Sequence, residues 1–266
     1  YKKLEIDTGK NIELLKLIRK YRKKTSASIW DKDQIFLFKK YIDIFKVGSG
    51  DIHNFEILDK ILKTGKPLII STGLSNILDI KETIKFIKKN NASYIEKKKL
   101  AFLHCNTAYP TPIEDSNLGT INYLKNILGL SIGYSDHTIG DEILIYSYLQ
   151  GAEIIEKHFS NNVKKKTFRD HAISLDKKKV NLFLSKLNNI SKLMQVKKKL
   201  TKSEKVQNNL FSFRRSIYAK SNIRKGQLFS KKNIISLRPF IKYSSKNYFK
   251  IINKKSKKNY KSGDLI

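Results

Sequence analysis

Short apolar runs alternate with longer amphipathic segments over the first 200 residues. Six runs have the length of a strand, and their starts lie 18 to 33 residues apart. After Ser75, which can cap a helix, Ile77, Ile80, Ile84 and Ile87 recur at helical spacing. This alternation predicts βα units and a parallel sheet, in either an α/β barrel or a doubly wound arrangement. The expected strands are 26–31, 44–49, 67–72, 100–105, 130–135 and 152–158.

The pattern changes toward the C-terminus. A long helix is expected after His171, with an apolar stripe from Val180 to Met194. Residues 195–207 are polar and basic and are interpreted as a linker. From 208 onward short β-like pieces surround a turn at 224–226. The expected domains are therefore 1–194 and 208–266, joined by 195–207.

Composition narrows the class of protein. No apolar run approaches the roughly 20 residues that span a bilayer, so no membrane association is expected. A single cysteine, Cys105, rules out an internal disulfide framework and favours the cytoplasm; its side chain is expected to be buried. The net charge of +32 comes from lysines spread over the whole chain, which argues against a specific nucleic-acid site while still attracting anionic substrates. His53 is expected in solvent, and Trp30 is expected to pack at the rim of the fold, although it could instead line a sugar site.

Polar side chains follow the end of nearly every expected strand. They include Lys46 with Ser49, then Ser71, then Thr107 with Tyr109. Ser135 with His137 and Glu156 with His158 complete the set. Because active sites of parallel α/β folds gather at the carboxyl ends of strands, these residues predict one shared site.

Two features of that site suggest ligands. His137 and His158 end successive strands and could share a divalent metal, or could be hydrogen-bonded rim histidines. Lys46, Ser49 and Ser71, with amides near Gly50 and Gly73, could bind a phosphate, or the small residues could simply turn the chain.

The segments FKVGSGD, PLIISTG, LHCNTAYPTP, GYSDHTIG and EKHF, in this order, resemble the sialic acid synthases, which make N-acetylneuraminate, legionaminate or pseudaminate. The tail RRSIYAKSNIRKGQLFSKKNIISLRP resembles their C-terminal antifreeze-like (SAF) domain. The resemblance implies a (β/α)8 TIM barrel followed by a SAF domain. It also implies condensation of phosphoenolpyruvate with an N-acylated amino sugar such as ManNAc, giving a nine-carbon sialic acid and phosphate. The implied metal is manganese, with magnesium or cobalt as alternatives, and the implied assembly is a domain-swapped homodimer.

Roles for individual residues follow from the same resemblance. The implied metal ligands are His137 and His158, which with Lys46 form the catalytic set. The implied phosphoenolpyruvate contacts are Lys46, Ser49, Ser71, Ser135 and Ser28. The implied sugar contacts are Thr107, Tyr109, Asp170 and, from the SAF domain, Arg238.

The resemblance also has limits. Aligned with the family, 26–31 corresponds to the third strand, so the first two barrel strands lie outside this chain. With their glutamate and lysine missing, the chain alone is expected to be poorly stable and nearly inactive. Phe240 stands where the family has glycine after Arg-Pro. Two other readings remain: a phosphoenolpyruvate–sugar condensing barrel of the octulosonate synthase type, and a non-catalytic remnant that binds anions or nucleic acid.

Overall fold

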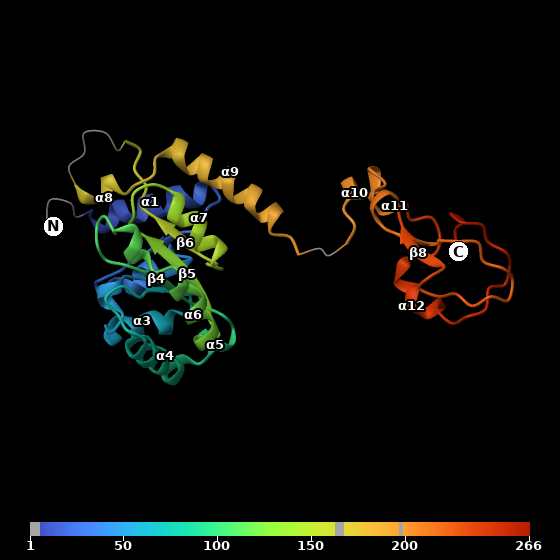
Figure 1. Cartoon of the computed structure of the whole chain (residues 1–266). Coiled ribbons are helices and arrows are strands. Elements are labelled where there is room, and N and C mark those ends of the chain that lie inside the picture. The colour runs from blue at the N-terminus through green and yellow to red at the C-terminus, as the bar shows by residue number, and fades with distance from the viewer. Residues whose placement is uncertain (1–5, 163–167, 197–198) are drawn as a thin grey trace. The chain divides into compact units, whose positions relative to one another are not determined.

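A computed structural model describes residues 6–162, 168–196 and 199–266. The chain divides into two compact units, Tyr1–Met194 and Gln195–Ile266, each of which is taken by itself (Figure 1). The larger unit contains a six-stranded parallel sheet in the order β1-β2-β3-β4-β5-β6. Its strands are β1 (Ser26–Ala27), β2 (Ile44–Val47), β3 (Leu68–Ser71), β4 (Leu100–Cys105), β5 (Ser131–Asp136) and β6 (Ile155–Lys157).

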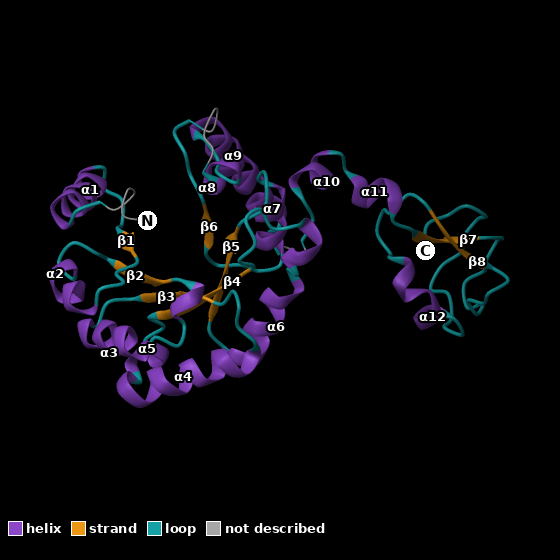
Figure 2. Ribbon diagram, turned by 90° about the vertical axis from the view of Figure 1, so that its left-hand side faces the viewer, coloured by secondary structure: helices purple, strands orange, loops and turns teal. Residues whose placement is uncertain are grey.

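Helices cover the outer side of this curved sheet, which forms a half-barrel (Figure 2). Consecutive strands lie side by side with helical connections between most of them, which is the βα arrangement that the spacing predicted. The sequential strand order excludes the doubly wound alternative, in which the order reverses. The helices are α1 (Thr8–Lys20), α2 (Ile35–Phe38), α3 (Phe55–Thr64), α4 (Ile77–Asn91), α5 (Ser93–Glu96), α6 (Gly119–Leu128), α7 (Glu142–Leu149), α8 (Arg169–Ala172) and α9 (Lys177–Leu193).

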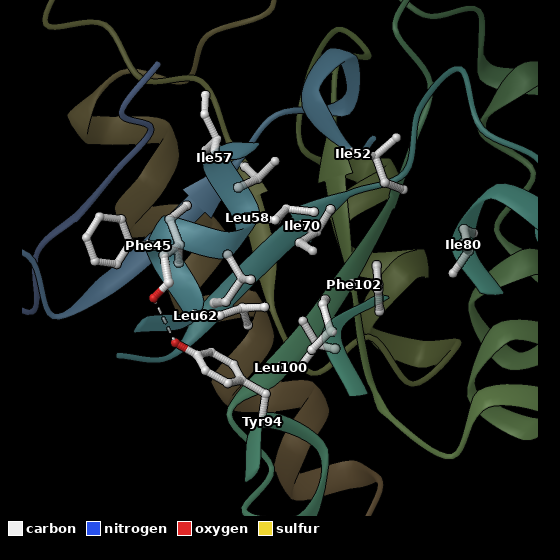
Figure 3. Close-up of a cluster of buried hydrophobic side chains, with 14 of the residues drawn as sticks. Phe45, Ile52, Ile57, Leu58, Leu62, Ile70, Ile80, Tyr94, Leu100 and Phe102 are labelled. Carbon is white, nitrogen blue, oxygen red and sulfur yellow. Dashed lines mark hydrogen bonds between the residues drawn. The ribbon is translucent and has the colours of Figure 1, made fainter. Parts of the chain in front are cut away.

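The hydrophobic core lies between the strands and the inner faces of these helices (Figure 3). Phe45, Ile70 and Phe102 come from β2, β3 and β4 and are fully buried. Leu58 of α3 packs against them, and the buried Tyr94 hydroxyl donates to the Ile61 carbonyl at 3.2 Å. This packing fixes the strands, and therefore the positions of the side chains at their carboxyl ends.

The first and last strands are shorter than expected. The expected strand 26–31 forms only Ser26–Ala27, and 152–158 forms only Ile155–Lys157. Beyond β6, Phe159 makes an isolated parallel bridge to Leu175. The backbone therefore continues in an extended path past His158, which keeps that residue at the end of the sheet.

Two local expectations are wrong, and the segment expected as a linker carries a helix that was not expected. Asn76, not Ser75, caps α4, because its side chain accepts from the Leu78 and Asp79 amides in a capping box. The expected linker contains α10 (Lys202–Val206), where Thr201 and Glu204 form a second capping box. Trp30 does not pack at the rim, since 76% of it is exposed.

The smaller unit is built on an antiparallel pair, β7 (Ser216–Ala219) and β8 (Ile234–Leu237). Ile217, Ile223 and Ile234 are buried in its own small core. Isolated bridges such as Ile223 to Tyr260 and Leu228 to Lys255 tie the remaining loops together. Its other helices are α11 (Asn209–Phe213) and α12 (Tyr248–Ile251).

Candidate active site

The expected anion-binding side chains meet at the carboxyl ends of the strands. Lys46 Nζ of β2 donates to Ser71 Oγ of β3 at 2.7 Å and lies 3.4 Å from Glu156 Oε1 of β6. Ser135 Oγ of β5 donates to the same Glu156 oxygen at 2.7 Å. The Lys46 side chain is 14% exposed, so its ammonium is largely shielded from water. The structure therefore brings Lys46, Ser71 and Ser135 into one cluster.

Sequence reasoning assigned no role to Glu156, which links this cluster. Ser135 and Glu156 are opposite each other in the β5–β6 register. Side chains alternate across a strand, so Glu156 lies on the same face as His158, two residues later. That spacing was the signal available in the sequence. Its carboxylate occupies hydrogen-bonding positions on Lys46 and Ser135 that an anionic ligand could take instead.

Ser49 lies beside the cluster, where β2 and β3 give way to loops. Its hydroxyl oxygen accepts from the Gly73 amide at 3.0 Å and lies 3.2 Å from Cys105 Sγ. A Cβ on Gly73 would lie 2.6 Å from Thr107 Cγ2, so the loops after β3 and β4 approach too closely for a side chain at that position. Cys105 is buried, as expected. Ser28 borders the other side, where it and Lys46 line one small void.

The two histidines lie next to each other, with ring centroids 5.4 Å apart. Tyr109 stacks on His137 at 4.1 Å and meets the His158 ring edge-on at 6.0 Å. Burial is the largest influence on the pKa of His137 and lowers it, although its bond to Asn106 opposes this. A lowered pKa keeps the imidazole neutral, which is the form that binds metals.

A hydrogen bond also selects the tautomer of His137. Nδ1 lies 2.5 Å from the Asn106 carbonyl oxygen, which can only accept, so Nδ1 carries the proton and Nε2 carries the lone pair. A backbone carbonyl that orients one ring nitrogen is the usual outer contact of a metal-binding histidine. His158 Nδ1 lies 3.9 Å from Asp170 Oδ2. Within the described ranges no group of three or more His, Cys, Asp or Glu side chains is arranged around a common point. The pair thus fits a metal as two imidazole ligands.

Tyr109 and Asp170, two of the expected sugar contacts, adjoin the histidines, and Arg169 links them. Arg169, which sequence reasoning missed, places its guanidinium over the Tyr109 ring at 4.6 Å, and its Nε lies 3.5 Å from Asp170 Oδ1. Tyr109 and Asp170 therefore border the imidazole pair. Only the position of Arg169 next to Asp170 could have suggested it.

Arg238 belongs to the smaller unit and is described there alone. Its Nε donates to the Phe213 carbonyl at 2.9 Å, and the guanidinium lies over the Phe213 ring at 5.5 Å. His53 is exposed at the surface, as expected, with 45% of its side chain accessible and Nε2 3.9 Å from Asp79 Oδ1. Among the described helices, none combines the length and apolar character needed to cross a membrane.

Comparison with known proteins identifies the family and the fold. Residues 1–199 match the model of the NeuB family. The N,N'-diacetyllegionaminic acid synthase of Campylobacter jejuni is 35% identical over 266 residues, which cover 99% of this chain and 78% of that protein. The pseudaminic acid synthase of the same species is 31% identical over 241 residues, which cover 90% of this chain and 68% of that protein. This chain belongs to the NeuB family.

Solved structures extend the likeness to the fold. A crystal structure of spore coat polysaccharide biosynthesis protein E from Chromobacterium violaceum superposes with a TM-score of 0.83 at 22% identity, covering 98% of this chain and 77% of that one. The N-acetylneuraminic acid synthetase of Leptospira borgpetersenii superposes with a TM-score of 0.68 at 28% identity. The superposition covers 77% of this chain and 70% of that one.

Proposed function

We propose that this chain is the phosphoenolpyruvate- and metal-binding part of a synthase that joins phosphoenolpyruvate to an N-acylated amino sugar. The products are a nine-carbon sugar acid of the sialic acid type and phosphate. One observation carries the proposal: the Lys46–Ser71–Ser135 cluster and the His137–His158 pair lie at the same carboxyl edge of one parallel sheet. NeuB family membership and relatives that are legionaminic and pseudaminic acid synthases support it.

The anion cluster would bind phosphoenolpyruvate. Lys46 supplies a shielded positive charge, and Ser49, Ser71 and Ser135 supply hydroxyl donors to phosphate or carboxylate oxygens. Binding would displace Glu156 from Lys46 and Ser135, since one oxygen of Glu156 occupies both partners. Fixing the phosphoenolpyruvate in this way lowers the entropic part of the barrier to carbon–carbon bond formation.

His137 and His158 would hold the divalent metal, for which manganese is the first candidate. When bound, the metal acts as a Lewis acid on an oxygen of the sugar. Asn106 keeps His137 in the tautomer with Nε2 available, and Tyr109 packs against the ring. Tyr109, Thr107 and Asp170 would contact the sugar. We further propose that the smaller unit is the SAF domain, whose Arg238 reaches the sugar site of a second copy.

Equilibrium binding tests the proposal. Mn²⁺ and phosphoenolpyruvate are each titrated into the protein, and phosphate release is followed with both present and candidate N-acyl amino sugars added. We expect His137→Asn and His158→Asn to abolish Mn²⁺ binding, while His53→Asn, at an exposed position, leaves it unchanged. Mn²⁺ binding that survives both site substitutions would contradict the two-histidine site.

A further inference from the structure

A buried ion pair lies on the opposite face of the same two strands. Asp136 and Lys157 are opposite each other in the β5–β6 register, one position after Ser135 and Glu156. Because side chains alternate along a strand, this pair points away from the site, toward the helices. Lys157 Nζ lies 2.5 Å from Asp136 Oδ2, and the two side chains are 8% and 0% exposed.

The contacts of this pair enclose the backbone of His137. Lys157 Nζ donates both to Asp136 and to the Thr138 carbonyl, the latter at 2.6 Å. Asp136 in turn accepts from the Thr138 amide at 3.2 Å and from its hydroxyl at 3.1 Å. The residues on both sides of His137 are therefore held by one ammonium group. Lys157 is itself the residue before His158, so that ammonium connects the backbones of both histidines.

We propose that Lys157 and Asp136 are positioning residues that fix the distance and orientation of the His137 and His158 imidazoles for a shared divalent metal. The proposal rests on the proposed function, because it requires the two histidines to be ligands. Both residues act through their neighbours in the chain, and neither touches the metal.

Physical chemistry favours a positioning role over a stabilising one. Removing two charges from water costs about as much as their attraction returns, so a buried ion pair adds little stability over apolar residues of similar volume. An apolar pair cannot supply directional hydrogen bonds. The Lys157 ammonium meets a carboxylate and a carbonyl at hydrogen-bond distance, which fixes the strand ends relative to each other.

A double substitution separates the two roles. Lys157→Met alone leaves the Asp136 carboxylate buried without its cation and destabilises the fold strongly. Asp136→Asn combined with Lys157→Met removes both charges, and we expect its urea midpoint to return close to that of the wild type. We expect its dissociation constant for Mn²⁺ to remain about 10- to 100-fold weaker, the usual effect of losing outer contacts of a metal site. Mn²⁺ alone is the probe, and the electron paramagnetic resonance signal of free Mn²⁺ measures binding without substrate or turnover.

A partly exposed ion pair between α6 and the segment before β6, at the other end of the sheet, provides the control. Lys125 Nζ lies 2.7 Å from Glu153 Oε1, and Ser131 at the start of β5 donates to Glu153. Lys125→Met with Glu153→Gln should leave the Mn²⁺ dissociation constant unchanged.

Each outcome has one meaning. A double variant of Asp136 and Lys157 that binds Mn²⁺ as tightly as the wild type overturns the positioning role. If that variant does not fold, Lys157→Arg decides in the same way, since it keeps both buried charges and changes only the geometry of the contacts with Asp136 and the Thr138 carbonyl. Wild-type Mn²⁺ binding that does not depend on His137 instead contradicts the proposed function itself.

Discussion

Gly73 is the position where one added methyl group most directly tests the geometry of the site. It follows β3, and a Cβ there would lie 2.6 Å from Thr107 Cγ2, 2.8 Å from Ser49 Oγ and 3.0 Å from Cys105 Sγ. The backbone φ of Gly73 does not lie in the left-handed region, so alanine meets no backbone penalty there. The whole free-energy cost of the substitution therefore comes from these contacts. Ordinary contact begins at 3.4 Å, so the Thr107 methyl overlaps by 0.8 Å.

Gly73→Ala is expected to destabilise the larger unit by about 1–3 kcal/mol, the usual cost of an extra methyl in a closely packed site. In a unit of that size, this lowers the midpoint of thermal unfolding by about 2–12 °C. The substitution should also weaken phosphoenolpyruvate binding, because the added methyl pushes Ser49 away from the Gly73 amide. Thermal unfolding followed by circular dichroism measures the first effect, and calorimetric titration with phosphoenolpyruvate measures the second.

Two further variants make the result specific. Gly50→Ala, in the neighbouring loop, has nothing within 4 Å of its added Cβ and should change neither quantity. Thr107→Ser removes the methyl that clashes most, so combining it with Gly73→Ala should recover part of the lost stability. A Gly73→Ala variant as stable as Gly50→Ala would refute the close approach of the β3 and β4 loops.

Three other predictions concern charge, protonation and core packing. Lys46→Met should weaken phosphoenolpyruvate binding about 10- to 150-fold, since hydrogen bonds to a charged group contribute about 1.5–3 kcal/mol. The control in calorimetric titration is Lys32→Met, which breaks the exposed contact with Glu56. Equal phosphoenolpyruvate affinities for the two variants would be evidence against the anion cluster. Burial lowers the pKa of His104 below 6.5, so the unfolded chain takes up this proton at a higher pH than the folded protein does. The free energy of unfolding should therefore fall as the pH decreases through 6.5 and below, and His104→Gln should flatten this dependence in urea titrations at several pH values; an unaltered slope would exclude His104 as its source. Phe102→Ala should lower the free energy of unfolding in urea by about 3–5 kcal/mol, because the side chain is fully buried. Phe36→Ala, at an exposed position, should lower it by under about 1 kcal/mol. Equal losses for the two variants would contradict the assigned core.

Several features could be predicted from the sequence because they depend on periodicity and chain direction. Alternating apolar runs and amphipathic segments indicated a parallel sheet, and a parallel sheet places its strand ends at one edge. Lys46, Ser71, Ser135 and the two histidines could therefore be expected to lie together from the sequence alone. The resemblance to sialic acid synthases, which family membership confirms, rested on motifs from these same strand ends.

Local details were less predictable, because neighbouring residues compete for the same role. Ser75 and Asn76 are both good helix caps, and only the backbone path determines that Asn76 faces the α4 amides. The polar segment 195–207 gave no apolar periodicity, yet the capping box of Thr201 and Glu204 begins a short helix in it.

The sequence by itself determined which chemical groups the strand ends carry, because strand order and side-chain alternation follow from the hydrophobic pattern. Only the tertiary structure decided how those groups pair. Glu156 bridges Ser135 and Lys46, whose positions in the chain lie far apart, and the Asn106 carbonyl selects the tautomer of His137. These partners come from different strands and loops, so their distances depend on the curvature and register of the sheet. Curvature and register are set by the packing of the whole core, and no local pattern of residues records them.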